Sequence, residues 1–445
     1  MNTLAKRLLL AVSLTASPLV AAAQTAPTAQ IAAPQTVRGV DLSDGAGDKS
    51  MFSRDRNIAV RERARPEYQA LGLSNGGFSS FPKVEGGLEY NDNIFAASTG
   101  RTSDWIWRVK PQFYTQSNWS QHLLDFYGSA TFNRYFSNTT ENTTDWDIGA
   151  DGRLDVNRAT NVGAGAEFSR FTEPRTSSGA PIAAAHPVQY TVGQSYLDGS
   201  RVFNRLKLSA RGDWKKFDYI SVPSILGGLI GENNRDRTYT DAVGRADYAI
   251  SPDTAVFIEA SGNWRDYRKP GTLLNPARDS QGYQVLGGAN FDLTSLLRGE
   301  IGVGYIHQDY KSALYGDTGG FGARATVEWF PSQITTVTAT ASRSIEDSAI
   351  VGSGGYLTTN GGLQVDHEFL RNLIVSANAS YGNDSYNGVD RTDRRYGAGL
   401  SATYLLTRRI GLNTGYTYFK QNSSGAQGGQ DFRVNRFTVG LVLQY

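Results

Sequence analysis

The sequence predicts an all-β protein, a transmembrane antiparallel up-and-down β-barrel. Three observations predict it. Residues 77–445 repeat segments of strand length in which apolar and polar side chains alternate. The final residues, 437–445, carry an apolar or aromatic side chain at every second position. The first residues resemble an export leader, so the chain is expected to leave the inner membrane.

The leader begins with the cationic residues Lys6 and Arg7, and an apolar stretch and three alanines follow, ending at Ala23. This order is typical of a signal peptide, with cleavage between Ala23 and Gln24. The apolar stretch is too short to span a bilayer as a helix. We therefore expect residues 1–23 to be removed and the mature chain to reside in the bacterial outer membrane.

Composition excludes several other classes of protein. The chain has 44 Lys and Arg against 42 Asp and Glu, and loss of the leader's two cations leaves 42 of each. A neutral chain has no bulk attraction to nucleic acid. The absence of cysteine excludes disulfides and thiolate chemistry. The 23 Tyr, 20 Phe and 49 Gly are typical of membrane strands with aromatic girdles.

Residues 24–76 are predicted to form a flexible periplasmic segment, because the first part is rich in Ala, Pro, Thr and Gln without periodicity. The segment ends in a basic cluster: Arg54, Arg56, Arg61, Arg63 and Arg65. One interpretation of the cluster is a solvated linker. The other is a docking segment for a periplasmic export partner, or a partial plug that binds an anionic polymer.

The barrel region, residues 77–445, is predicted to contain eighteen strands, although sixteen remain possible. Tight turns are expected at 116–120, 157–160, 203–205, 251–253, 294–297, 331–333, 370–372 and 406–409. The longest loops are expected at 173–187, 223–235, 269–278, 348–355 and 421–430. An even number of strands places both termini in the periplasm, with the turns there and the long loops outside.

Alternation also assigns the two faces of each strand. Apolar sets such as Val256, Ile258 and Trp264 are predicted to contact outer-membrane lipid. The interleaved polar residues are predicted to line a wet lumen: Arg108, Lys110, Asp147, Asp151, Arg153, Lys207, Arg211, Asp213, Arg245, Asp247, Arg324, Glu328, Asp366 and Glu368.

The last strand resembles the C-terminal signal that the barrel-assembly machinery of diderm bacteria reads. Its alternating apolar residues are Phe437, Val439, Leu441, Leu443 and Tyr445. The resemblance implies that the assembly machinery is a partner of the newly exported chain.

The sequence contains almost no residue pattern that is typical of a catalytic site. The four histidines, at 122, 186, 307 and 367, are isolated from one another, so no metal site with short His spacing is present. A barrel hydrolase that uses His186 or His307 is the enzymatic alternative. Asp147, Asp151 and Asp155 lie about 13 Å apart along one strand face, too far for an acid–base pair. We predict that the protein is not an enzyme and has no cofactor.

A family resemblance enters near the first strand. Residues 60–68 (VRERARPEY), Gly76-Gly77-Phe78 and 87–94 (GLEYNDNI) resemble the opening of outer-membrane β-barrel proteins encoded in bacterial exopolysaccharide operons. The resemblance implies a porin or an export channel for a capsular, holdfast or extracellular polysaccharide. Three functions remain open: an export pore for polysaccharide, a diffusion porin for small hydrophilic solutes, and a structural or adhesive barrel with a closed lumen.

Overall fold

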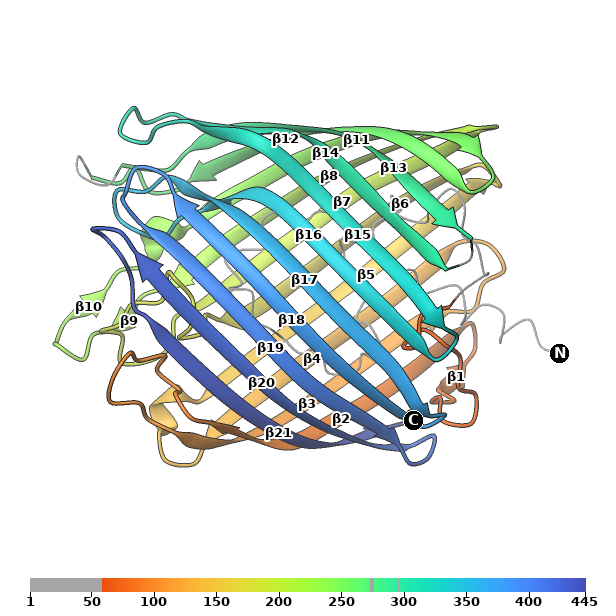
Figure 1. Ribbon diagram of the computed structural model, residues 1–445, viewed down its shortest axis with the longest axis horizontal. Coiled ribbons are helices and arrows are strands. Elements are labelled where there is room, and N and C mark those ends of the chain that lie inside the picture. The colour runs from red at the N-terminus through yellow and green to blue at the C-terminus, as the bar shows by residue number, and fades with distance from the viewer. Residues whose placement is uncertain (1–57, 273–275, 295) are drawn as a thin grey trace.

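The computed structural model describes residues 58–272, 276–294 and 296–445. The chain forms a closed barrel of eighteen antiparallel strands (Figure 1). Each strand pairs with the next one in sequence, and the last wall strand returns to the first, where Gly87 lies opposite Gly440. The predicted fold class and strand number are confirmed.

The wall strands are β2 (Phe78–Asn91), β3 (Asp104–Ser117), β4 (Leu123–Tyr135), β5 (Thr143–Asn157), β6 (Thr160–Thr172), β7 (Gln189–Phe203), β8 (Leu206–Ile220), β11 (Arg237–Ser251), β12 (Thr254–Tyr267), β13 (Ser280–Leu293), β14 (Leu297–Tyr310), β15 (Thr318–Ser332), β16 (Thr335–Asp347), β17 (Gly355–Leu370), β18 (Leu373–Tyr386), β19 (Thr392–Leu405), β20 (Ile410–Ser424) and β21 (Phe432–Gln444). The short strand β1 (Leu73–Asn75) extends β2, and β9 (Val222–Pro223) pairs with β10 (Leu229–Ile230) inside one loop. Two 3₁₀ turns complete the set, η2 (Thr139–Glu141) and η3 (Asn233–Arg235). Among the described residues, no helix has the length and apolarity needed to cross a bilayer.

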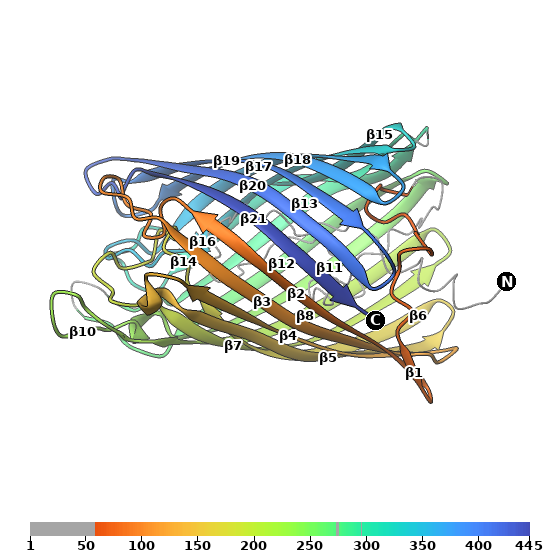
Figure 2. The same ribbon diagram turned by 90° about the horizontal axis from the view of Figure 1, so that it is seen from below.

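The connections alternate in length, as the sequence predicts. Short turns gather at the end of the barrel that holds β1 and Tyr445, and the longer loops gather at the opposite end (Figures 1 and 2). We call these the periplasmic and the outer end. The turn between β7 and β8 contains Asn204 with a φ of 54°, a conformation that Asn tolerates better than most residues. One predicted loop begins too early: β20 continues to Ser424 because Gln421 still pairs with Phe432.

The outer surface of the wall is apolar because every second residue points away from the barrel axis. On β12, Val256, Ile258 and Trp264 are 40%, 60% and 47% exposed. The predicted assembly residues on and just beyond β21 are also exposed: Phe437, Val439, Leu441, Leu443 and Tyr445. Their exposure suits contact with lipid, and their role in assembly stays a prediction. The described residues form no conventional apolar core that fills the barrel, because the alternate residues of the strands are largely polar.

Candidate channel lumen

Ion pairs between non-adjacent strands identify the inner face of the wall. Arg245 on β11 reaches Glu300 on β14 at 2.7 Å, although β12 and β13 lie between these strands. Side chains can span two intervening strands only across the concave side of a curved sheet. The polar residues that alternate with the exposed apolar set therefore face the lumen.

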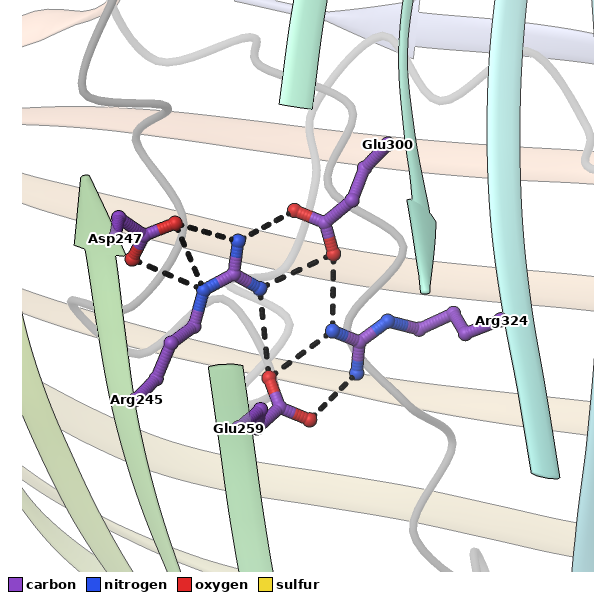
Figure 3. Close-up of polar contacts among 5 residues, drawn as sticks. All are labelled: Arg245, Asp247, Glu259, Glu300 and Arg324. Atoms are coloured by element: carbon purple, nitrogen blue, oxygen red, sulfur yellow. Dashed lines mark hydrogen bonds and ion pairs between the residues drawn. The ribbon is translucent and has the colours of Figure 1, made fainter. Parts of the chain in front are cut away.

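A cluster of five charged residues occupies the middle of this inner wall (Figure 3). Arg324 makes two parallel hydrogen bonds of 3.0 Å to Glu259 and a third, of 2.9 Å, to Glu300. Arg245 binds Glu300 and also Asp247, the latter at 2.8 Å. Each guanidinium thus contacts at least two carboxylates, which is the geometry in which a buried arginine is best compensated.

The charged cluster packs against an aromatic ring and two glycines of the wall. The guanidinium of Arg245 lies 3.9 Å from the centre of the Phe257 ring. A Cβ at Gly288 would lie 2.6 Å from that ring, and one at Gly302 would lie 3.0 Å from it. Glycine at these two positions lets Phe257 lie flat against the wall beneath the charges.

Most other predicted lumen residues pair along the same inner face. Ion pairs join Arg108 to Glu89 (3.0 Å), Arg153 to Asp155 (2.9 Å), Arg211 to Asp213 (2.7 Å), and Glu328 to Arg298. Asp151 accepts a hydrogen bond of 2.8 Å from Tyr196, and Asp147 accepts one from Ser129. In the strand register Lys110 lies opposite Glu85, and Lys207 opposite Asp247. The inner wall therefore carries charged residues along its length, and positive and negative charges lie next to one another.

At the periplasmic end, residues 58–68 lie against the inner wall; we call them the inner-wall segment. Three of the arginines predicted to form a docking cluster bind the wall. Arg61 pairs with Asp366 at 2.6 Å, while Arg63 and Arg65 pair with Glu368 at 3.0 and 2.7 Å. The two carboxylates predicted to line the lumen are thus the partners of this segment. Arg54 and Arg56 lie outside the described residues.

Further contacts fix the course of the inner-wall segment. Val60 is fully buried, and its N–H donates to Thr336 Oγ1 at 2.9 Å. Glu62 pairs with Arg298 at 3.1 Å. The carbonyl of Tyr68 accepts from the amide of Gln444 at 3.2 Å. The segment therefore spans from β14 and β16 towards β21 across the periplasmic mouth.

At the outer end, the wall separates between two strands. The backbone pairing of β15 with β16 stops at Ala323 and Arg343, although β16 continues to Asp347. Residues 344–347 stay paired with β17 but no longer with β15, and together with the loop 348–354 they reach into the lumen; we call residues 344–354 the tip. Asp347 on the tip reaches Arg237 on β11 at 2.9 Å and Arg265 on β12 at 2.7 Å. The tip therefore crosses part of the outer mouth.

Two outer loops cover a second part of the mouth. Loops 173–188 and 221–236 pack on a largely aromatic apolar patch of the inner wall formed by Tyr190, Val192, Phe217, Tyr219 and Tyr239. Arg235 holds the loops together, since it pairs with Glu173 and with Glu232, each at 2.9 Å, and lies 4.1 Å above the Tyr219 ring. Burial raises the pKa of the Glu232 carboxyl, and the positive charge of Arg235 opposes this.

Several residues of this lumen were missing from the predicted set. Glu259 and Arg265 alternate with the lipid-facing residues of β12, so the same period-two rule would have found them. Asp347 could not be found in this way, because it lies where β16 has separated from β15 and pairs only with β17. One further cluster joins His307, Asp309 and Asp317, whose ligand-type atoms lie within 4.8 Å of one another.

Comparisons with known proteins find similar solved structures and one matching family. No curated protein matches the chain. Similar solved structures include a mutant ferric enterobactin receptor (PfeA) of Pseudomonas aeruginosa, with 8% identity, TM-score 0.46 and coverage of 85% of this chain and 81% of that one. Another is the outer membrane protein OpdK of P. aeruginosa, with 11% identity, TM-score 0.43 and coverage of 82% and 99%. The siderophore receptor PirA of Acinetobacter baumannii has 8% identity, TM-score 0.44 and coverage of 84% and 81%.

A family model described as "Putative beta-barrel porin 2" matches residues 65–445, nearly the whole of the described chain. The match covers every wall strand, including the charged cluster of Figure 3 and the closing pair of β2 and β21. The expected outer-membrane location follows from the family, as does the general function of an outer-membrane channel. The chain belongs to this family of outer-membrane β-barrel porins.

Proposed function

We propose that this porin exports an exopolysaccharide or capsular polysaccharide across the outer membrane. The main support for the proposal is the composition of the inner wall. Its charged, hydroxyl and amide groups extend from the inner-wall segment at the periplasmic end to the tip at the outer end. Such groups hydrogen-bond sugars weakly and repeatedly, and a polymer needs such contacts in order to slide without being trapped. The resemblance to proteins of exopolysaccharide operons supports the same substrate class.

Both mouths are partly covered by segments held through contacts that a polymer or a partner could exchange. The inner-wall segment is held largely by arginine–carboxylate pairs at the periplasmic end. Ion pairs near water are exchanged more readily than packed apolar surface. We propose that a periplasmic export partner, or the polymer itself, displaces the inner-wall segment when export begins.

A diffusion porin for small hydrophilic solutes is the second candidate. The tip and loops 173–188 and 221–236 narrow the outer mouth, which favours passage of small molecules. Under this alternative the wall contacts stay in place during transport.

A strain that lacks this protein separates the two candidates. We expect secreted polysaccharide to fall while the polymer precursor continues to be made, and we expect the parent gene to restore secretion. Complementation with a variant in which Arg61, Arg63 and Arg65 are all Gln tests the inner-wall segment, with Arg134→Gln as a matched control on an exposed arginine.

Secreted polymer would be measured in the medium by sugar analysis, and solute uptake by the swelling of proteoliposomes. Normal secretion in the deletion strain, together with slower entry of small sugars, would overturn the export proposal and favour the diffusion porin.

A further inference from the structure

The tip at the outer mouth is tied to the wall by arginines that have few acidic partners. Arg237 on β11 and Arg265 on β12 share the single carboxylate of Asp347. Arg278, in the loop before β13, donates to the backbone carbonyl of Ser348 on the tip. All three arginines are only 3% exposed. Three guanidinium groups thus converge on one tip residue and its neighbour.

The hydrogen bonding of this site is incomplete. Arg265 donates to Asp347 at 2.7 Å and to the carbonyl of Ile345 at 2.9 Å. Its Nε is buried and finds no hydrogen-bond acceptor among the described residues. A buried charged donor without an acceptor is rare in folded proteins, and it marks a place where another acceptor would be stabilised.

The acids and the arginines belong to different parts of the fold. Asp347 and the next acid, Glu346, both lie at the end of β16, which has separated from β15. The arginines belong to the paired wall and the loop beside it, where Arg237 stacks on Phe217 at 4.4 Å and Arg278 on Tyr267 at 5.0 Å. Movement of the tip would therefore remove both acids and leave three oriented cations on aromatic faces.

We propose that Arg237, Arg265 and Arg278 form a carboxylate-binding site for an acidic polysaccharide, in which Asp347 occupies the place of a substrate carboxylate while the tip crosses the outer mouth. The proposal rests on the proposed function and adds the substrate class, a polymer of carboxylated sugars. Guanidinium groups bind carboxylates through charge-assisted hydrogen bonds. The aromatic rings beneath them can pack against sugar rings. Each arriving carboxylate replaces Asp347, so the substrate itself opens the tip.

Binding to the purified barrel tests the site without any secretion assay. The probes are an oligogalacturonate, which carries a carboxylate on each sugar, and a neutral malto-oligosaccharide of equal length, both titrated by calorimetry at low salt. Asp347→Asn removes the competing carboxylate with little change of shape. We expect it to tighten oligogalacturonate binding by about tenfold or more and to leave malto-oligosaccharide binding unchanged.

Arg265→Gln and Arg278→Gln, each added to Asp347→Asn, should abolish that gain. Arg268→Gln is the matched control, because Arg268 is a more exposed arginine that pairs with Asp218 and Asp236. Folding of every variant is checked by its heat-dependent mobility on gels. Equal gains for the acidic and neutral probes, or a gain that survives loss of Arg265 in a folded barrel, would overturn the proposal. Normal secretion in the deletion strain would overturn the export function, whereas the binding result depends only on the site.

Discussion

Replacing Glu368 by Gln should release the inner-wall segment from the periplasmic end of the lumen. Glu368 is the common acceptor of Arg63 and Arg65, at 3.0 and 2.7 Å. Gln keeps the shape of the side chain but removes its charge. Arg65, which is 4% exposed, would then have no carboxylate partner there and would keep only neutral acceptors: the amide oxygen of the new Gln and the carbonyls of Val60, Arg63 and Arg371.

The magnitude follows from the burial of this pair. Removing one partner of a fully buried ion pair costs about 3–5 kcal/mol. Because Arg65 keeps three hydrogen bonds to carbonyls and lies near the aqueous mouth, we expect about 2–3 kcal/mol. That free energy corresponds to a rise of roughly 30- to 160-fold in the population of the released segment.

Limited trypsin digestion of the purified barrel measures this population. Trypsin cuts after Arg61 and Arg63, and both residues remain in the variant. When opening and closing are fast, the cutting rate follows the open population. The single-channel conductance in a planar bilayer should rise in parallel, since the segment no longer covers part of the mouth.

Glu67→Gln is the matched control, because it makes the same change of charge on the segment itself. The Glu67 side chain is 60% exposed, and its nearest cationic atom, on Arg371, is 3.9 Å away. We expect parental digestion and conductance from this variant. If Glu368→Gln also kept parental values, the ion pairs would not hold the segment, and the argument from its contacts would be wrong.

Three other predictions follow from the wall and the outer loops. Ala260→Arg, on the lipid face of β12, should cost about 2–4 kcal/mol of unfolding free energy in urea titrations. Arg153→Ala, on the lumen face, breaks only a part-exposed pair with Asp155 and should leave the unfolding free energy nearly unchanged; equal effects would show that the faces are misassigned. Arg324→Ala leaves the three carboxylates of the cluster with one arginine, so it should lower the unfolding free energy by about 3–5 kcal/mol and increase the conductance. An unchanged unfolding midpoint would refute the buried cluster. Arg235→Ala should free loop 173–188, which would be cut faster by protease added to intact cells; unaltered cleavage would mean that this arginine does not hold the loops.

Much of the barrel could be predicted because its physics is local. A strand that separates lipid from water must alternate, so Ile258 and Arg245 reveal their faces without knowledge of their neighbours. Turn residues such as Asn204 mark the strand ends, which is why the predicted number of strands is confirmed. The same rule indicates which residues can line a lumen, although it does not indicate how they pair.

Which lumen side chains form ion pairs with one another depends on the curvature of the closed wall. Arg245 and Glu300 are 55 residues apart, and Arg61 and Asp366 are 305 apart, so no local pattern relates them. The arginine cluster illustrates the difference: the sequence indicates a concentration of positive charge, but only the folded barrel brings Asp366 and Glu368 opposite it.

The sequence by itself determined the closed antiparallel barrel, its two faces and the ends at which turns and loops gather, because the boundary between lipid and water acts on each residue separately. Only the tertiary structure decided that the end of β16 separates from β15 and that Asp347 meets Arg237 and Arg265 across the mouth. The alternation of apolar and polar residues does not extend to strand ends, because residues there no longer face lipid on one side. Their positions are set by the charges that closure of the barrel brings within reach.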